Sequence, residues 1–377
     1  MGSERGDRRD FLKASLVTAG AVWAGSRPRR AAAAQEPAKA PRLRFAAVGL
    51  NHGHVYSMCE AVVRGGGELV SYFAKEPDLA AAFGKRFPQA KLARSEKEIL
   101  EDPSIPLVAS AGIPNERGPL GIEVMRHGKD YMVDKPGMTT LEQLAEVKRV
   151  QAETRRIYSI AYSERFENRA TTKAGDLVKA GAIGKVIQTI GLGPHRENPK
   201  TRPDWFYEKE RYGGILCDIA SHQFDQFLFF TGSTRAEIVA AQVANVHHPD
   251  HPGLEDFGDV MLQGDRGTGY IRVDWFTPGG LNTWGDGRLT VLGTDGFIEV
   301  RKNVDIAGRP GGSHLFLVDQ KETRYVDSQD QDLPYGRQLV DDVLNRTETA
   351  MPQEHCFLAM ELALRAEKQA RPLRLPS

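Results

Sequence analysis

The stretch Leu43-Arg44-Phe45-Ala46-Ala47-Val48-Gly49-Leu50-Asn51-His52-Gly53-His54 decides the fold of this chain. Its first six residues are mostly apolar, which is typical of a buried strand, and a helical pattern follows as far as Val63. Gly49 permits a tight turn, and the helix N-terminus beyond it can face a pyrophosphate. This order predicts a dinucleotide-binding unit, although Asn51 and His54 stand at two positions that usually hold glycine. We predict nucleotide contacts from Gly49, Asn51, His52, Gly53 and His54.

Strand-like and helical segments alternate after this stretch, which predicts a doubly wound parallel sheet. The strand-like runs are 69–73, 106–111 and 131–133, and a helical pattern covers 121–126. After the first run, Ala74 stands where an acidic residue commonly binds the ribose hydroxyls of NAD, and Lys75 follows. A lysine without that carboxylate favours the 2′-phosphate of NADP over NAD. Alternatively, Lys75 is only a solvated turn residue.

Open sheets of this kind bind ligands beyond the carboxyl ends of their strands. Tyr131-Met132-Val133 ends there in Asp134-Lys135-Pro136, and the preceding strand is followed by Ile113-Pro114-Asn115. We therefore predict that Pro114, Asn115, Asp134 and Lys135 lie at the ligand-binding edge and contact a cofactor.

A second chemical motif is Gly213-Gly214-Ile215-Leu216-Cys217-Asp218-Ile219-Ala220-Ser221-His222-Gln223-Phe224-Asp225. On a helix, Asp218, His222 and Asp225 would lie on one face, because they fall at i, i+4 and i+7. A histidine between two carboxylates suits proton transfer near neutral pH. Alternatively, His222 is a buried core histidine that the aspartates only hold in place.

Together, the two motifs resemble the Gfo/Idh/MocA oxidoreductase family, which includes glucose–fructose oxidoreductase and inositol dehydrogenase. Asp134-Lys135-Pro136 stands for the usual Glu-Lys-Pro of the family. Gly214, Asp218, His222 and Asp225 match the second family motif in order, and the resemblance covers roughly 43–371.

The resemblance implies a Rossmann domain, which we place at 43–157, followed by a substrate-binding and oligomerisation domain at 158–377. The second domain is expected to be α/β, with a large, mostly antiparallel sheet. Its last helices could pack back on the first domain. Family members commonly pair through the open face of that sheet, so we expect a dimer or tetramer.

The resemblance also implies roles for individual residues. Lys135 would lie close to nicotinamide and to the substrate hydroxyl, and His222 would act as general base in oxidation. Asp218 would bind substrate or orient His222, and Asp225 would be structural. Arg165, with Tyr162, is expected to contact substrate. Gly118 stands where the family often has a histidine, so the details of cofactor geometry differ.

The aromatic run Trp205-Phe206-Tyr207 precedes the paired glycines, and aromatic faces stack well on sugar rings. We predict that Trp205 forms a substrate wall, although ordinary hydrophobic packing would also explain the run. Further strands are expected at 184–190, 237–243, 258–263, 269–276, 288–292 and 297–301, with helices at 173–180, 333–344 and 354–368. Residues 161–165 are expected to form a strand followed by a turn.

Composition limits the partners. Acidic and basic residues number 50 each, which gives no electrostatic case for nucleic acid or an anionic membrane as partner. Cys59, Cys217 and Cys356 are far apart, so we expect no disulfide framework and no thiolate metal site. His52 and His54 have no thiol or carboxylate near them in the sequence, and we expect no metal there.

The N-terminus resembles a twin-arginine export signal. Arg8-Arg9-Asp10-Phe11-Leu12-Lys13 precedes a modestly apolar stretch and a small-residue cleavage site at 31–34. We expect a signal peptide at 1–34, a linker at 35–42, and a mature protein that is periplasmic or extracytoplasmic, without a membrane segment. The twin-arginine route carries folded proteins and is often used when a cofactor must be loaded before export.

We therefore predict an NAD(P)-dependent oxidoreductase that acts on a hydroxyl of a sugar, sugar derivative or polyol and holds its cofactor tightly. Two alternatives stay open. One is an NAD-dependent glycosidase that oxidises a sugar transiently and reduces it again after eliminating an aglycone. The other is a non-catalytic protein that binds nucleotide or sugar.

Overall fold

The structure, a computed structural model, describes residues 42–373. The twin-arginine motif, the expected signal peptide at 1–34 and almost all of the linker lie outside these residues. Within 42–373, no helix is both long and apolar enough to cross a membrane.

The first sheet contains six parallel strands in the order β3-β2-β1-β4-β5-β6. Every residue of β4, β5 and β6 is buried, which explains why their sequences lack an alternating pattern. The strand order reverses between β1 and β4: β1 to β3 extend the sheet to one side, and β4 to β6 extend it to the other. Open sheets of this kind bind ligands at such a switch point. The strands are β1 Leu43–Val48, β2 Gly67–Phe73, β3 Lys91–Leu92, β4 Leu107–Ser110, β5 Asp130–Asp134 and β6 Tyr158–Ala161.

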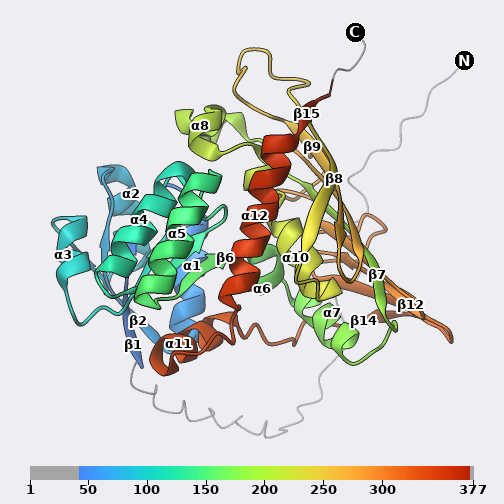
Figure 1. The fold of residues 1–377 in the computed structure, drawn as a ribbon, viewed down its shortest axis with the longest axis horizontal. Coiled ribbons are helices and arrows are strands. Elements are labelled where there is room, and N and C mark those ends of the chain that lie inside the picture. The colour runs from blue at the N-terminus through green and yellow to red at the C-terminus, as the bar shows by residue number, and fades with distance from the viewer. Residues whose placement is uncertain (1–41, 374–377) are drawn as a thin grey trace, which may run out of the picture. The chain divides into compact units, whose positions relative to one another are not determined.

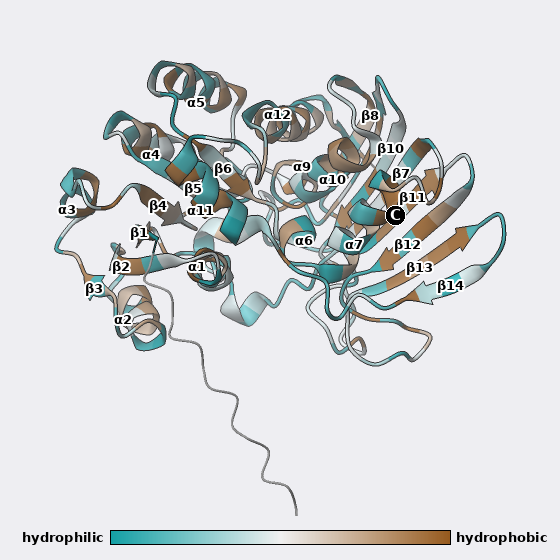
Figure 2. Ribbon diagram, turned by 90° about the horizontal axis from the view of Figure 1, so that it is seen from below, coloured by the Kyte–Doolittle hydropathy of each residue, from teal (hydrophilic) through white to brown (hydrophobic). Residues whose placement is uncertain are grey.

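Five helices accompany this sheet, and Figure 2 shows α4 and α5 on one of its faces and α1 and α2 on the other. They are α1 His54–Arg64, α2 Pro77–Arg86, α3 Glu96–Glu101, α4 Pro114–Arg126 and α5 Leu141–Thr154. The prediction of a doubly wound parallel sheet is confirmed.

The second sheet has nine strands in the order β14-β13-β12-β11-β7-β10-β9-β8-β15. Neighbouring strands are antiparallel except for the pairs β7–β10 and β8–β15, so the expected mostly antiparallel sheet is confirmed. Its strands are β7 Val186–Pro194, β8 Ala236–Ala244, β9 Phe257–Gly264, β10 Thr268–Asp274, β11 Arg288–Gly293, β12 Gly296–Arg301, β13 His314–Asp319, β14 Thr323–Val326 and β15 Arg371–Pro372.

Helices lie on one face of this second sheet (Figure 2). Helix α10 packs on β7, α7 packs on β12 and β13, and α12 packs on β8. Helix α12 also contacts α5 and β6, so it lies between the two sheets in Figure 1. The helices are α6 Ser163–Phe166, α7 Arg169–Lys179, α8 Lys209–Tyr212, α9 Ile215–Asp218, α10 Ser221–Thr231, α11 Tyr335–Asn345 and α12 Gln353–Gln369.

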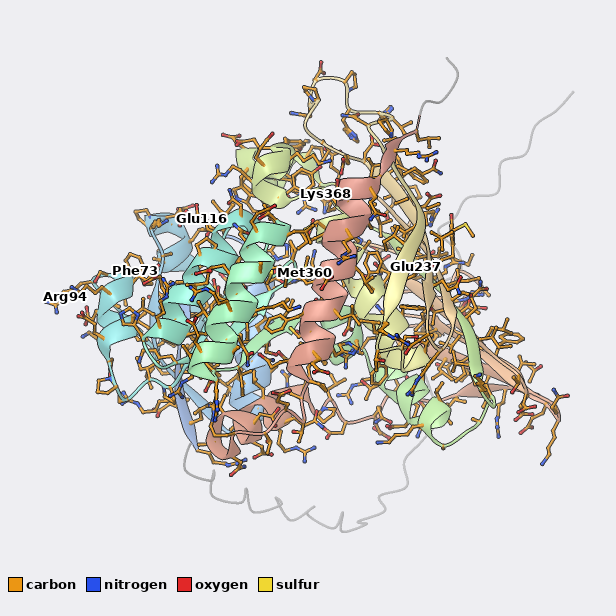
Figure 3. The ribbon with its side chains drawn as sticks, viewed as in Figure 1. Phe73, Arg94, Glu116, Glu237, Met360 and Lys368 are labelled. Carbon is orange, nitrogen blue, oxygen red and sulfur yellow. The ribbon has the colours of Figure 1, made fainter. Side chains whose placement is uncertain are left out.

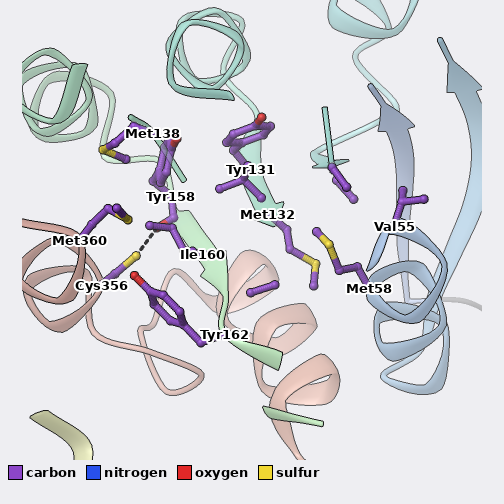
Figure 4. Packing of buried hydrophobic residues seen from close by; sticks show 14 of the residues in the cluster. Val55, Met58, Tyr131, Met132, Met138, Tyr158, Ile160, Tyr162, Cys356 and Met360 are labelled. Carbon is purple, nitrogen blue, oxygen red and sulfur yellow. Dashed lines mark hydrogen bonds between the residues drawn. The ribbon is translucent and has the colours of Figure 1, made fainter. Parts of the chain in front are cut away.

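A single apolar cluster continues from the first sheet onto α12. Figure 4 shows Tyr131 and Tyr158 from β5 and β6 beside Cys356 and Met360 of α12. The Cys356 thiol donates a hydrogen bond to the carbonyl of Tyr158 at 3.3 Å, and the Tyr158 hydroxyl donates to the carbonyl of Gly137 at 2.7 Å. This core fixes the end of β5, and therefore Lys135, relative to the second sheet's helix layer.

The stretch 213–225 is not one helix, which corrects the sequence prediction. Helix α9 ends at Asp218 and α10 begins at Ser221. The Ser221 hydroxyl donates to the Asp218 carbonyl at 2.7 Å, and the His222 N–H bonds to the Ile219 carbonyl instead. A serine hydroxyl competes in this way for backbone acceptors. Asp218 and His222 therefore belong to different helices.

Two smaller differences concern residues 163–166, which form the short helix α6 rather than a turn, and β13 and β14, which the sequence did not predict. The aromatic run lies on a single 3₁₀ turn, Asp204–Tyr207.

Candidate functional site

A cleft of about 470 Å³ opens at the carboxyl ends of β1, β2 and β4, and we call it the Gly49 cleft. Gly49 has φ +72°, and a Cβ atom there would lie 3.0 Å from Cα of Gly112. Only glycine fits that approach, so the turn keeps its backbone open to a ligand. Phe73 and Glu116, which also line the cleft, are labelled in Figure 3.

Three predicted nucleotide contacts besides Gly49 line this cleft: Asn51, Lys75 and Asn115. The Asn115 Oδ1 atom is buried and has no hydrogen-bond partner within residues 42–373. The Asn51 amide donates to Glu76 at 2.8 Å, and the exposed Lys75 ammonium lies 3.3 Å from Glu116. An unpaired buried carbonyl is costly, so Asn115 has the character of a ligand contact.

A second cleft, of about 310 Å³, adjoins the first, since Arg117 lines both; we call it the Lys135 cleft. The Lys135 ammonium lies 2.7 Å from Oδ1 of Asp218, which joins the end of β5 to the end of α9. Both side chains are largely buried. Burial acts to raise the pKa of Asp218, but the Lys135 charge and hydrogen bond lower it below its usual value. The structure therefore brings together residues that are far apart in sequence.

His52 and His54 line the Lys135 cleft rather than the Gly49 cleft. Their Nδ1 atoms each lie 2.9 Å from an oxygen of Asp134, whose carboxylate is also 3.2 Å from Arg117. The expectation that these histidines lack a carboxylate neighbour is wrong, because β5 delivers Asp134 to them. The three side chains form a group whose atoms could bind a metal ion, although Arg117 and Lys135 make the surroundings cationic.

Burial and the neighbouring charges together set the protonation of this group. Desolvation lowers the pKa of His52 to about 4, aided by His54 and opposed by Asp134. The pKa of Asp134 is well below its usual value, because His54, Arg117 and His52 outweigh its burial. At neutral pH the cleft thus holds a neutral His52 beside an ionised Asp134.

Among the remaining predicted contacts, Pro114 lines the Lys135 cleft and Gly53 lines neither cleft.

His222 lies beneath the site. Its side chain is almost fully buried, it lines neither cleft, and its Nδ1 atom has no partner in the described part of the chain. Burial lowers the pKa of His222 to about 3 despite the nearby Glu164 carboxylate. Its role as general base stays a prediction.

Arg165 lines neither cleft, contrary to the expectation that it contacts substrate. Its guanidinium forms two hydrogen bonds with Asp225, at 2.6 and 2.7 Å, and His355 binds the same carboxylate at 2.8 Å. This buried cluster ties α6 and α10 to α12. Tyr162 is also fully buried. The structural role expected for Asp225 agrees with these contacts.

Trp205 lines the Lys135 cleft and is one of several aromatic side chains there, and its role as a substrate wall stays a prediction. Sequence reasoning missed most of the other lining residues, because they come from α4 and from the segments that follow β7 and β10. Chain proximity gives no sign that these strand ends meet. The missed lining residues are Arg117, His195, Arg196, Asn198, Arg202, Trp275 and Trp284.

Comparison with known proteins settles the family. Residues 171–299 match the model of the GFO/IDH/MocA C-terminal domain. A crystal structure from Erwinia carotovora atroseptica SCRI1043, of a protein proposed to be an oxidoreductase, is 47% identical; it covers 88% of this chain and 100% of that one, with a TM-score of 0.86. The chain belongs to the Gfo/Idh/MocA family.

More distant relatives of this Gfo/Idh/MocA protein carry named activities. The NAD⁺-dependent scyllo-inositol 2-dehydrogenase of Bacillus subtilis strain 168 is 27% identical over 260 residues, which is 66% of this chain and 72% of that enzyme. The NADP⁺-dependent scyllo-inositol 2-dehydrogenase of the same organism is 28% identical over 181 residues, 46% of this chain and 49% of that enzyme.

In this Gfo/Idh/MocA chain, two carboxylates hold the start of α9, the helix that ends at Asp218. Glu255 accepts from the Ile215 N–H at 2.9 Å, and Glu367 accepts from the Leu216 N–H at 3.0 Å. The Lys209 ammonium bridges the two, 2.6 Å from Glu367. Anions at a helix N-terminus satisfy its free N–H groups.

Glu367 should make stability depend on pH. Burial and then the Glu255 charge raise the pKa of Glu367 to about 7, against the effect of Lys209. The folded state therefore binds more protons than the unfolded state between about pH 4.5 and 7, so stability falls as pH rises through this window. We expect a fall of roughly 3 kcal/mol at most. Glu367→Gln should flatten this dependence in urea unfolding at pH 5, 6, 7 and 8; an unchanged slope would contradict the assignment.

Proposed function

We propose that this protein is an NAD(P)-dependent oxidoreductase that transfers hydride to or from a hydroxyl-bearing carbon of a sugar, sugar derivative or polyol. The observation that carries the proposal is the Lys135–Asp218 pair at 2.7 Å, in a cleft that adjoins the Gly49 cleft. The scyllo-inositol dehydrogenases among the relatives support the choice of substrate class.

The Gly49 cleft fits a nicotinamide dinucleotide on two structural grounds. A side chain at Gly49 would close the cradle against Gly112, and the unpaired Oδ1 of Asn115 offers an acceptor for a ribose hydroxyl or an amide. Gly49, Asn51, Lys75 and Asn115 would hold the dinucleotide there, and Lys135 would lie at its nicotinamide end. When bound, the nicotinamide supplies the hydride acceptor that no side chain provides. Lys75 supports NADP as the preferred form, because its ammonium is exposed at the cleft.

The protein's part in the reaction is to place the hydroxyl and manage its proton. The Lys135 ammonium would donate a hydrogen bond to the substrate oxygen and stabilise the negative charge that develops on it. Asp218 holds that ammonium in place through the 2.7 Å contact. The family resemblance assigns His222 as the acceptor of the hydroxyl proton. The low pKa of His222 keeps its imidazole neutral and so able to accept a proton, and the imidazolium that forms would be only a transient state.

The first test is to purify the folded protein, denature it, and identify any released nucleotide by mass spectrometry. We expect NADP or NADPH at a stoichiometry near one per chain, because an exported enzyme needs a retained cofactor. NAD in its place would make Lys75 incidental. Absence of nucleotide, together with no binding on titration with either dinucleotide, would overturn the oxidoreductase proposal.

Two further properties belong to the same proposal. Export by the twin-arginine route is supported by Arg8-Arg9-Asp10-Phe11-Leu12-Lys13, and retention of an Arg8→Lys/Arg9→Lys reporter fusion in the cytoplasm would test it. Homo-oligomer formation is supported by apolar side chains exposed on the large sheet, namely Ile187, Val239, Met261, Leu292 and Phe297. Light scattering after size exclusion would test the oligomer, and a monomeric mass would contradict it.

A further inference from the structure

The Lys135 cleft carries an excess of positive charge. Its lining holds four Lys or Arg side chains and only two carboxylates, while burial lowers the pKa of His52 and of His195 to about 4, which leaves both neutral at pH 7. The cations are Arg117, Lys135, Arg196 and Arg202, and the carboxylates are Asp134 and Asp218.

The two carboxylates are already paired. Arg117 lies 3.2 Å from Asp134, and Lys135 lies 2.7 Å from Asp218. The two remaining arginines account for the excess. Among residues 42–373, no carboxylate oxygen lies within 4.0 Å of the guanidinium of Arg196 or Arg202. A part-buried guanidinium without a counter-charge loses hydration and gains no ion pair in return.

Backbone carbonyls fix both arginines. Arg196 donates to the carbonyls of Leu281 and Thr283, and Arg202 donates to the carbonyls of Glu197 and Arg196. In each arginine these bonds use Nε and Nη2, and Nη1 has no hydrogen-bond partner within the described chain. The Arg202 guanidinium also lies over Phe206 and Trp275, with its Cζ 4.3 and 5.0 Å from the ring centroids. These contacts preorganise the donors without neutralising them.

Glu197, which follows Arg196 in the sequence, forms no ion pair with either arginine within residues 42–373. Glu197 accepts from the Tyr207 hydroxyl at 3.1 Å and lies 3.0 Å from Nε2 of His248. Its carboxylate therefore belongs to a separate network with Asp256, which binds the other His248 nitrogen. The positive charge of the cleft is left for a ligand.

We propose that the substrate is a sugar acid, whose carboxylate binds Arg202 and Arg196 and whose ring stacks on the tryptophans of the Lys135 cleft. This inference rests on the proposed oxidoreductase function and adds the substrate's charge to it. Arginine donors suit a planar carboxylate, and Trp205, Trp275 and Trp284 supply aromatic faces for a sugar ring. Lys135 and Asp218 line the same cleft as the two arginines. A sugar acid whose carboxylate is bound by the arginines can therefore present one of its ring hydroxyls to Lys135 for oxidation. A phosphate ester would satisfy the same charge.

The test uses three matched ligands: a uronic acid, its neutral parent aldose, and the corresponding sugar phosphate. The variants are Arg202→Gln, Arg202→Lys and, as control, Lys200→Gln, an exposed cation on the same loop. Turnover is followed by nicotinamide absorbance in the full-length holoprotein. Because three tryptophans line the cleft, quenching of tryptophan fluorescence measures binding independently of turnover.

We expect wild type to bind and turn over the uronic acid better than the neutral aldose. Arg202→Gln should lower kcat/KM for the acid by roughly 10- to 150-fold, mainly through KM, because a charged hydrogen bond is lost. The neutral aldose should change little, Arg202→Lys should restore part of the loss, and Lys200→Gln should behave as wild type.

Preference for the neutral aldose in wild type, or an equal loss for acid and aldose in Arg202→Gln, would overturn the inference. Preference for the sugar phosphate would overturn the carboxylate assignment and keep an anion site. If the protein holds no nucleotide and turns over none of the ligands, the proposed function fails. Fluorescence binding of the uronic acid, and its loss in Arg202→Gln, would still decide the charge of the ligand.

Discussion

Lys135→Met is expected to lower kcat by roughly 10²- to 10⁴-fold, the range found when a group that handles charge or protons at the reacting atom is removed. Lys135 is the cation at the end of β5 that pairs with Asp218 in the cleft adjoining the nucleotide site. Without it, nothing in the described cleft is equally placed to stabilise the developing alkoxide. The measurement is single-turnover reduction of bound nucleotide by substrate.

Controls separate this loss from misfolding or loss of nucleotide. Lys148→Met removes an exposed lysine, 3.8 Å from Glu361, and should leave kcat unchanged. Nucleotide content of Lys135→Met should stay near that of wild type, since the Gly49 cleft is untouched. Lys135→Arg keeps the charge but moves the donor, so it should recover only a small part of the activity. Retention of more than a tenth of wild-type kcat in Lys135→Met would refute this role.

Lys302→Met is expected to cost about 3 to 5 kcal/mol of folding stability, because it leaves Glu164 charged and buried without its cation. Both side chains of this ion pair are at most 5% exposed. The amides of Gln223 and Gln226 also donate to Glu164, at 2.8 and 3.3 Å, but they do not neutralise it. Urea unfolding at pH 7 measures the loss, and Lys321→Met, at an exposed site, is the control.

The stability lost in Lys302→Met should depend on pH in a definite direction. In wild type, burial acts to raise the pKa of Glu164, but the Lys302 ammonium and nearby histidines lower it to about 2. A lowered folded-state pKa contributes stability that is present above about pH 4.5 and is lost as pH falls towards 2. In Lys302→Met, burial should dominate, so the variant should be relatively more stable at pH 5 than at pH 8. Glu164→Gln in the Lys302→Met background should restore part of the stability, and a double variant no more stable than the single one would argue against the buried charge as the cause.

Local patterns were sufficient for β1, β2, β4 and β5, but they put the end of the first domain at 157, whereas β6 pairs with β5 in the first sheet. Buried parallel strands give continuous apolar runs, and Gly49 marks the turn because a side chain there would meet Gly112. The position of Lys135 follows from strand direction alone, since carboxyl ends of parallel strands share one edge. By contrast, at the break between α9 and α10 the Ser221 hydroxyl binds the Asp218 carbonyl and the His222 N–H binds the Ile219 carbonyl. The spacing of apolar residues in the sequence does not predict this break.

The sequence by itself determined the doubly wound sheet and the two motifs that contain Lys135 and Asp218, and the family resemblance of those motifs implied the mostly antiparallel second sheet. Only the tertiary structure decided that His52 and His54 lie against Asp134, that Arg165 binds Asp225, and that Arg196 and Arg202 enter the cleft without carboxylate partners. The reason is physical. Periodicity and turn residues report the local backbone, whereas ion pairing and burial depend on which distant segments meet when the two sheets pack around α12.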